Sequence, residues 1–285
     1  MNVERPALRY HGGKFRLATW LLQWFPPHEV YPECFGGAAG VLLRKPRAHG
    51  EVYNHLDGDV VNFFRVLRDP AQCALLEELV RLTPYARSEF EQAWEPCDEP
   101  LERARRLVIR ASMGFGSAGA TKGSTGLRTD LKRRFTTAQQ DWAAYPHAIR
   151  AAGERFSGVL IENRPAIDVL QQHDSPSTLH FVDPPYVLGR RCVRAQGGYR
   201  HELSDEEHEE LLEVLLELRG MVVVTGYYTD LYGSALRDWS LRSTQARAAG
   251  WRGTVMRREC AWLNPACAAA LNRAQGGLFA EVAHG

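Results

Sequence analysis

The sequence lacks the features that mark membrane-spanning, secreted and zinc-binding proteins. No stretch approaches the roughly 18 consecutive apolar residues of a transmembrane helix, and the first residues hold no apolar signal-peptide core. The 6 cysteines are scattered without a Cys-x-x-Cys pair, so the spacing of a structural zinc site is missing. A disulfide framework is not expected in a chain of 285 residues, which is long enough to bury a core without one. We therefore expect a cytoplasmic protein with reduced thiols, no metal and no membrane partner.

An excess of one charge is missing as well, because the net charge is only +1. Hydrophobic residues make up 45% of the chain, which excludes a fully disordered or fibrous protein. Without an overall field, a nucleic-acid partner has to be inferred from local patches. Residues 101–134 contain 9 Lys or Arg and only 2 Asp or Glu, whereas residues 202–217 contain 8 acids and no Lys or Arg. We interpret the acidic segment as a solvated helix face and the basic one as a possible DNA contact.

Short apolar runs bounded by turn residues predict seven strands. They lie at residues 29–35, 51–54, 158–162, 178–183, 221–225, 242–248 and 257–263. Helical periodicity is found at residues 15–24, 59–67 and 204–218, the last with Ser204 and Glu207 as a capping box. Strands that alternate with helices indicate an α/β fold with a mostly parallel, Rossmann-like sheet. The last two strands follow one another without a helix, which predicts an antiparallel hairpin at the sheet edge.

The alternation of strands and helices stops between residues 69 and 156. This stretch has a helical pattern around one glycine-rich segment, residues 114–126, and is too long for a simple connection. We therefore predict a main domain formed by residues 1–68 and 157–285, interrupted by a mostly helical inserted domain at residues 69–156.

Two glycine-containing motifs are suited to ligand binding. Tyr31-Pro-Glu-Cys-Phe-Gly-Gly-Ala-Ala-Gly40 carries a predicted strand into a glycine-rich turn and a helix-like segment, where backbone N–H groups can approach a ligand. It matches only part of the dinucleotide fingerprint Gly-x-Gly-x-x-Gly, and a plain tight turn is an alternative. Arg9-Tyr-His-Gly-Gly-Lys14 offers an ammonium after a glycine turn, but it is shorter than a phosphate-binding P-loop and, read alone, is more often a surface turn.

A third motif, Phe181-Val-Asp-Pro-Pro-Tyr186, is more specific. It ends a predicted strand, and in open parallel sheets ligands bind outside the carboxyl ends of the strands. Its prolines stiffen the turn and leave carbonyl groups free to accept hydrogen bonds. Asp183 adds a charged acceptor, and Tyr186 offers a flat face for stacking. These groups suit an amino group attached to a planar ring; the alternative is a proline-stiffened turn in which the aspartate caps a helix.

Together, the three motifs resemble those of the Dam-type DNA adenine methyltransferases, most closely their phage-encoded relatives. The resemblance rests on Tyr10-His-Gly-Gly-Lys14, Glu33-Cys-Phe-Gly-Gly37 and Asp183-Pro-Pro-Tyr186 in that order, with an insertion before the last. Further matching stretches extend it over nearly the whole chain, at residues 62–68, 112–117, 161–164, 199–202 and 262–265. The resemblance implies a Rossmann-like, S-adenosylmethionine-dependent methyltransferase domain, with the insertion as its target-recognition domain, in the cytoplasm of a bacterial or phage-infected cell.

The resemblance also implies roles for individual residues. Those implied to contact S-adenosylmethionine are Tyr10, Lys14, Glu33, Phe35, Gly37, Asn163 and Asp183. After the second strand, relatives carry an acid that binds the ribose hydroxyls, but here His55 occupies that position. A carboxylate accepts hydrogen bonds from both hydroxyls, whereas neutral imidazole has one acceptor nitrogen. Either cofactor binding is weakened, or a nearby acid takes over this role, with Asp57 as the first candidate and Asp59 as the second.

The implied reaction is transfer of a methyl group from S-adenosylmethionine to the 6-amino group of adenine in double-stranded DNA, with the target base flipped out of the helix. Asp183 and the Pro184 carbonyl would accept hydrogen bonds from the amino group. Pro185 stiffens the same turn, and Tyr186 would replace the lost stacking. No metal is required, and a monomer is expected. The basic residues expected to contact DNA are Lys122, Arg128, Lys132, Arg133, Arg134, Arg190 and Arg191.

Other functions stay open on the sequence alone. His55 favours a DNA-binding homologue with weakened or lost methyl transfer. The glycine turn is compatible with a nicotinamide-dependent oxidoreductase, which would leave the residues from Asp183 to Tyr186 unexplained. RNA is an alternative nucleic-acid substrate.

Overall fold

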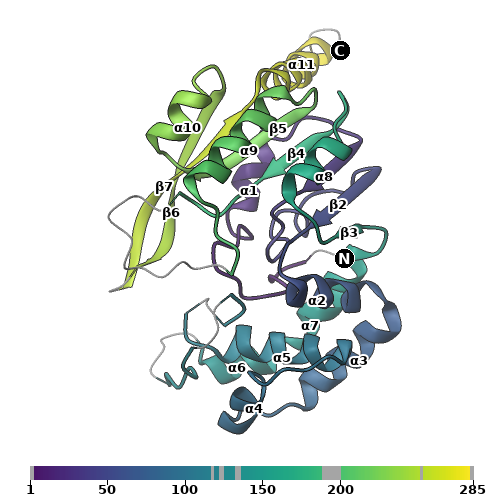
Figure 1. Ribbon diagram of the computed structural model, residues 1–285. Coiled ribbons are helices and arrows are strands. Elements are labelled where there is room, and N and C mark those ends of the chain that lie inside the picture. The colour runs from purple at the N-terminus through teal and green to yellow at the C-terminus, as the bar shows by residue number, and fades with distance from the viewer. Residues whose placement is uncertain are drawn as a thin grey trace.

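A seven-stranded sheet in the order β3-β2-β1-β4-β5-β7-β6 forms the centre of the molecule (Figure 1). The computed structural model describes residues 3–116, 119–121, 125–131, 136–187, 200–250 and 253–282. The strands are β1 (Val30–Glu33), β2 (Gly50–Asn54), β3 (Leu160–Glu162), β4 (Leu179–Val182), β5 (Met221–Tyr227), β6 (Ser240–Gly250) and β7 (Gly253–Leu263). Strands β1 to β5 pair in parallel, and β7 runs antiparallel to both β5 and β6. The chain therefore has a mixed α/β fold with a mostly parallel sheet.

Each predicted strand has a counterpart in this sheet, and the closing hairpin is confirmed. Strand β4 is buried throughout and β5 nearly so, as expected for central strands covered on both faces. Strands β6 and β7 are longer than predicted, because their pairing continues from Ser240 opposite Leu263 to Gly250 opposite Gly253. The parallel part has the order 3-2-1-4-5 of a doubly wound sheet, in which the direction of winding changes between β1 and β4.

Helices cover the sheet and form a further layer beyond one of its ends (Figure 1). The helices outside the insertion are α1 (Ala18–Leu21), the 3-10 helix η1 (Leu22–Trp24), α2 (Gly58–Arg68), α8 (Ala166–Gln172), α9 (Asp205–Glu217), α10 (Asp230–Ala235) and α11 (Pro265–Val282). The insertion contains α3 (Pro70–Leu82), α4 (Arg87–Gln92), α5 (Pro100–Met113), α6 (Ala138–Ala143) and α7 (Pro146–Phe156). The predicted capping box of α9 is present: the Glu207 N–H donates to the Ser204 hydroxyl at 3.2 Å, and the Ser204 N–H donates to the Glu207 carboxylate at 2.7 Å.

The segment after the glycine turn, predicted to be helix-like, does not form a regular helix, although the Leu43 N–H donates to the Ala39 carbonyl and the Lys45 N–H to the Val41 carbonyl, both at 2.9 Å. Residues 34–45 form successive hydrogen-bonded turns, and Ala39 has a positive φ of 54°. The Leu42 N–H donates to the buried Glu33 carboxylate at 2.8 Å instead of to a helical carbonyl. The backbone of the turn itself, and not a helix N-terminus, therefore faces any ligand at this strand end.

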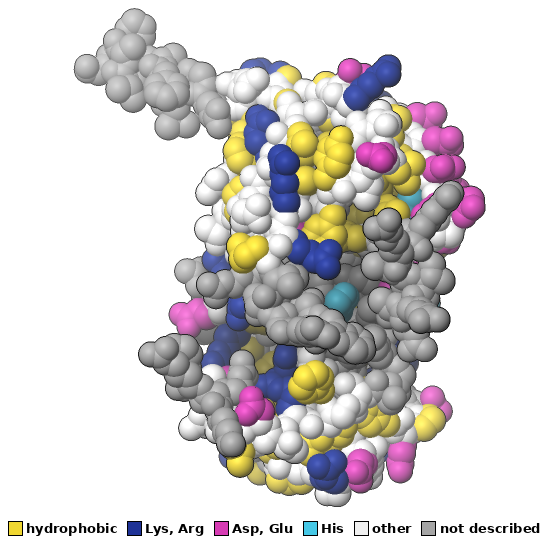
Figure 2. All heavy atoms as spheres, turned by 90° about the vertical axis from the view of Figure 1, so that its left-hand side faces the viewer, with side chains coloured by type: hydrophobic (Ala, Val, Ile, Leu, Met, Phe, Trp, Pro, Cys, Tyr) yellow, Lys and Arg dark blue, Asp and Glu magenta, His cyan; other side chains and the backbone are white. Residues whose placement is uncertain are grey.

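Charged side chains of both signs are scattered over the face that Figure 2 shows, in keeping with the net charge of +1. Within the described residues, no helix is both long and apolar enough to cross a membrane.

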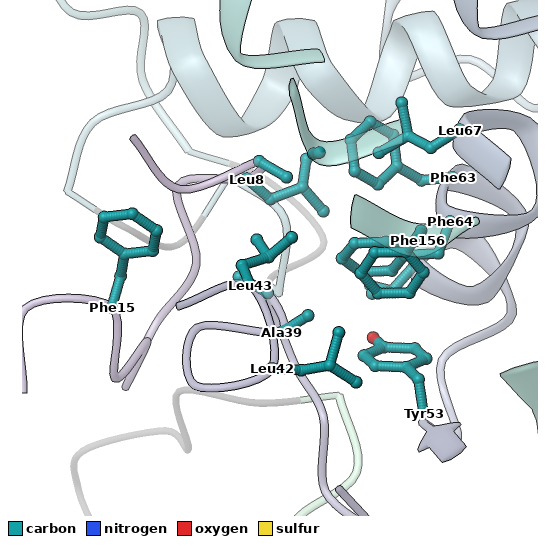
Figure 3. Close-up of a cluster of buried hydrophobic side chains, with 14 of the residues drawn as sticks. Leu8, Phe15, Ala39, Leu42, Leu43, Tyr53, Phe63, Phe64, Leu67 and Phe156 are labelled. Carbon is teal, nitrogen blue, oxygen red and sulfur yellow. The ribbon is translucent and has the colours of Figure 1, made fainter. Parts of the chain in front are cut away.

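The inserted helices share one hydrophobic core with the sheet. Helices α3, α5 and α7 pack against α2, which itself follows β2. Phe64 of α2 stacks on Phe156 of α7 with ring centroids 4.3 Å apart, and Phe64 lies 4.6 Å from the ring of Tyr53 on β2 (Figure 3). All three rings are fully buried. The insertion therefore continues the main core and does not fold around a separate one.

Candidate active site

A cleft with a volume of about 310 Å³ lies at the carboxyl ends of β1 and β4, where the winding of the sheet changes. In doubly wound sheets this is the usual place for a ligand. Residues from all three sequence motifs line it, together with the loop after β2 and residues 200–203. The predicted site residues that line the cleft are Tyr10, Lys14, Glu33, Phe35, Gly37, His55, Asp57, Asp183 and Pro185.

Lys14 and Asp183 form an ion pair in this cleft. The Lys14 Nζ lies 3.0 Å from Asp183 Oδ2, donates to the Gly12 carbonyl at 2.9 Å, and lies 4.8 Å from the centroid of the Tyr186 ring. Both charged side chains are largely buried, at 8% and 15% exposure. The ammonium that was predicted to contact S-adenosylmethionine therefore contacts the aspartate of the Asp-Pro-Pro-Tyr motif in this structure.

Two residues that sequence reasoning missed hold this motif in place. The Thr225 hydroxyl, on β5, donates to Asp183 Oδ1 at 2.7 Å. The Tyr186 hydroxyl donates to Glu259 Oε2, on β7, at 2.8 Å. A signal for both was present, because each is a polar residue in or at the end of a predicted apolar strand. Pro184 and Tyr186 are not among the described residues that line the cleft; together with Pro185 they line a second, smaller cavity, beside β5 and α10.

The glycine turn passes close to the end of β2, which explains its composition. A Cβ at Gly36 would lie 2.2 Å from the ring of Tyr53, and Gly37 has a positive φ of 48°. The Tyr53 hydroxyl donates to the Gly37 carbonyl at 2.6 Å, and the Gly36 N–H donates to the Asn54 carbonyl at 2.8 Å. These contacts fix the shape of the turn against β2 and leave its outer surface to the cleft.

Glu33, at the end of β1, is a buried carboxyl that faces the cleft. It accepts hydrogen bonds from the Tyr31 hydroxyl at 2.9 Å and from the Leu42 N–H at 2.8 Å, both through Oε2. Burial raises its pKa to about 8, and the charge of Asp183 adds to the rise, although both hydrogen bonds oppose it. A cationic group in the cleft would favour the ionised form.

His55 and Asp57 are both brought to the cleft, but in different states. The His55 Nε2 shares a hydrogen bond of 2.9 Å with the Tyr10 hydroxyl. Burial lowers the pKa of His55 to about 4, so the ring is neutral at neutral pH. Asp57 caps α2 by accepting from the Asp59 N–H through Oδ1, and the same oxygen pairs with the Arg200 guanidinium at 3.3 Å. Its Oδ2 is buried without a hydrogen-bond partner. Of the two, Asp57 has the unused acceptor.

Asn163 has a different place from the one predicted. Its side-chain amide donates to the carbonyls of His55 and Leu56, at 2.7 and 3.0 Å. Asn163 is not among the described residues that line the cleft. Its amide nitrogen therefore anchors the loop after β2 on which His55 and Asp57 lie.

The arginines of α5 are engaged inside the protein. Arg103 and Arg110 form ion pairs with Asp59 at 2.6 and 3.1 Å, and Arg200 reaches the same carboxylate at 2.9 Å from the other side of the cleft. Arg105 and Arg106 pair with Glu102 on their own helix, at 2.6 and 2.8 Å. These contacts direct the four guanidinium groups of α5 toward carboxylates of the protein. Glu102 already belongs to the charge count of residues 101–134, so of these two acids only Asp59 offsets the basic excess further.

The predicted DNA contacts are described only in part. Arg128 is 12% exposed, donates to the Ser112 carbonyl at 3.2 Å and lies 3.7 Å from the Asp141 carboxylate, which places it in the packing of the insertion. Lys122, Lys132, Arg133, Arg134, Arg190 and Arg191 lie outside the described residues. Figure 2 shows other Lys and Arg side chains on the face that it draws.

Among the described side chains, no group of three or more His, Cys, Asp or Glu is arranged to hold a metal ion.

Comparisons with known proteins give little guidance. No family model matches the chain, and no curated protein matches it. Among solved structures, precorrin-8w decarboxylase from Methanobacterium thermoautotrophicum is similar over 88% of this chain and 89% of its own, with 11% sequence identity and a TM-score of 0.34. A likeness this distant carries no argument about the reaction.

Proposed function

We propose that the protein is an S-adenosylmethionine-dependent methyltransferase that modifies the 6-amino group of adenine in double-stranded DNA. The observation that carries this proposal is the meeting of the three sequence motifs in one cleft. Tyr10 and Lys14, Glu33 and Gly37, and Asp183 come from distant parts of the chain, and all line the cleft between β1 and β4. That meeting is what the resemblance to Dam-type enzymes implies, and a nicotinamide-dependent oxidoreductase gives no reason for it.

The residues on the β1 and β2 side fit S-adenosylmethionine chemically. S-adenosylmethionine would supply a methyl group bonded to a positively charged sulfur. The unpartnered buried Oδ2 of Asp57 suits a ribose hydroxyl, which His55 does not need to bind. The Glu33 carboxyl suits an ammonium group, and Phe35 offers an apolar surface beside it. The volume of about 310 Å³ is within the range of small-molecule clefts.

The residues on the β4 side fit an amino group on a planar ring. Asp183 and the Pro184 carbonyl are the acceptors for its two hydrogens, and Tyr186 is the surface on which a flipped base would stack. Thr225 and Lys14 hold the Asp183 carboxylate, so its orientation is set before the base arrives. A carboxylate oxygen has more than one lone pair, and Asp183 therefore keeps capacity for the amino group. Its negative charge stabilises the positive charge that develops on the amino nitrogen.

The decisive experiment is methyl transfer from tritiated S-adenosylmethionine to unmethylated duplex DNA of mixed sequence, followed by sequencing of the modified sites. We expect label on the 6-amino group of adenine at a defined sequence. The Asp183→Ala protein is the matched control and should give none. Parallel reactions with single-stranded RNA distinguish the alternative substrate. Binding of S-adenosylmethionine without any transfer would favour a DNA-binding homologue, and absence of binding would contradict the proposal.

A further inference from the structure

A buried carboxylate on β7, Glu259, contacts the tyrosine of the Asp-Pro-Pro-Tyr motif. Because β7 runs antiparallel to β5, Glu259 is in register with Tyr227, the last residue of β5, at the carboxyl ends of the parallel strands. Glu259 is 8% exposed, and its Oε2 accepts the hydrogen bond from the Tyr186 hydroxyl at 2.8 Å. The antiparallel strand thus brings a charged group to the edge of the candidate active site.

Tyr186 is held at several points of its side chain. Its ring meets the ring of Tyr227 in a T-shaped arrangement, with centroids 4.6 Å apart and planes at 70°. The Lys14 ammonium lies 4.8 Å from its centroid, and the hydroxyl is bound to Glu259. Contacts to both the ring and the hydroxyl restrict rotation about χ1 and χ2, so they define the plane of the ring.

The strand itself gives no reason for a carboxylate at position 259. The next residues of β7, Cys260, Ala261 and Trp262, are buried and largely apolar. Burial raises the pKa of Glu259, the Lys14 charge and the Tyr186 hydrogen bond lower it, the Asp183 charge raises it, and the charge of Arg257, on the same strand, lowers it. Removing a carboxylate from water is costly unless it is hydrogen-bonded. The described hydrogen bond that meets this cost is the one to Tyr186.

We propose that Glu259 is a positioning residue that fixes the Tyr186 ring as the stacking surface for the target adenine. The proposal rests on the proposed function. Glu259 acts through Tyr186 and does not touch the base. A site of this kind requires its contacting groups to be held within roughly 10–20° of the productive geometry. Because Glu259 is not among the described residues that line the cofactor cleft, its loss should slow transfer and leave S-adenosylmethionine binding unchanged.

The test compares Glu259→Leu, Glu259→Gln and Tyr186→Phe with the wild type, using the duplex identified by methylation sequencing. We expect Glu259→Leu to lower kcat roughly 10- to 100-fold, the effect of a misplaced reactant. Glu259→Gln keeps an oxygen that accepts the same hydrogen bond, so its rate should stay within about threefold of wild type. Tyr186→Phe should lose about as much as Glu259→Leu, and the double variant no more. Glu213→Leu, which removes an exposed acid from α9, is the control.

A second measurement follows Tyr186 without relying on transfer. The ring-carbon resonances of Tyr186, assigned with the Tyr186→Phe protein after carbon-13 labelling of tyrosine, should shift in Glu259→Leu and return in Glu259→Gln. Unchanged resonances, or a Glu259→Leu protein with wild-type kcat, would overturn the positioning role. Equal losses in Glu259→Leu and Glu259→Gln would also overturn it, because the hydrogen bond would then not be the cause. If the Tyr186 resonances shift as expected in Glu259→Leu but the wild-type protein transfers no methyl group, the proposed function is contradicted instead. Glu259 then has no reaction to assist.

Discussion

The two sides of the cleft differ in how their polar groups are paired. On the side of β1 and β2, Glu33 is buried with a raised pKa and Asp57 has a buried oxygen without a partner. On the side of β4 and β5, Asp183 is already bound by Lys14 and Thr225. The first side is suited to a ligand that brings its own donors and its own positive charge. The second is organised in advance, so a substrate there meets acceptors whose orientation is fixed.

Removal of Asp183 should have the largest effect, because it takes away the acceptor around which the second side is built. We expect Asp183→Ala to lower the rate of methyl transfer by at least about 10²- to 10³-fold, the usual loss when a preorganised electrostatic group is deleted. The affinity for S-adenosylmethionine, measured by calorimetry, should change far less. Asp183→Asn, which keeps the shape but not the charge, is the matched variant. Substantial transfer by Asp183→Ala would contradict the mechanism.

Removal of Lys14 breaks the same ion pair by taking away the cation and leaving Asp183 in place. Lys14→Ala leaves the largely buried Asp183 carboxylate without its cation. Breaking a buried ion pair by removing one partner costs roughly 3–5 kcal/mol. Since Asp183 retains some exposure and its bond to Thr225, we expect a loss near the lower limit, about 3 kcal/mol in the free energy of unfolding measured with urea. The exposed Arg16 supplies the control, and a loss in Lys14→Ala no larger than in Arg16→Ala would show that the pair adds no stability.

On the side of β1 and β2, the buried Glu33 carboxyl should make the stability of the protein depend on pH. Glu33 has a folded-state pKa of about 8, above its ordinary 4.5, so the folded state binds its proton more tightly than the unfolded state. Its contribution is fully present below pH 4.5 and is lost as the pH rises through 8. The lowered pKa of His55 acts in the opposite direction, but only below its ordinary value of 6.5.

Between pH 6.5 and 8, wild-type stability should therefore fall relative to Glu33→Gln, by up to about 1.4 kcal/mol per pH unit. Urea unfolding of both proteins at several pH values measures the difference. Parallel stability curves in this range would mean that Glu33 is ionised in the folded protein.

The smallest expected effect is on the affinity for S-adenosylmethionine, through Asp57, the proposed acceptor for a ribose hydroxyl. Asp57→Asn keeps the helix cap, since asparagine caps as well as aspartate, but replaces the acceptor oxygen that has no partner by an NH2 group, which only donates. We expect S-adenosylmethionine to bind about tenfold more weakly, as for loss of a charge-assisted hydrogen bond. His55→Gln should alter binding less, because His55 is already bound to Tyr10. The opposite ranking of the two variants by calorimetry would restore His55 as the ribose contact.

Local patterns in the sequence predicted most of the sheet. Continuous apolar runs such as residues 221–225 predicted buried strands, and the absence of a helix between the last two runs predicted the hairpin. Glu33 and Asp183 lie at one edge because the parallel strands β1 and β4 end on the same side, whereas a common site with Lys14 was implied only by the resemblance. These predictions depend on short-range composition and on a general rule of α/β sheets.

Local sequence patterns could not predict contacts between residues that lie far apart in the sequence. The segment that follows the glycine turn was expected to be helix-like, but the Leu42 N–H within it donates to the buried Glu33 carboxylate instead of to a helical carbonyl. The arginines of α5 were counted as free charges because the position of Asp59 beside them depends on how α2 packs. Glu259 was missed because its partner Tyr186 is set by the register of β7 on β5.

The place of β7 also has a consequence for the order in which the protein is made. On the ribosome the chain emerges from its N-terminus, so the residues of the glycine turn and of Asp57 are available long before Glu259. Strand β7, although made after β6, lies between β5 and β6. Until it is added, β5 has an open edge, which is a template for pairing with another chain. A nascent or truncated protein that ends before residue 253 would thus have both an incomplete catalytic centre and a surface prone to aggregation.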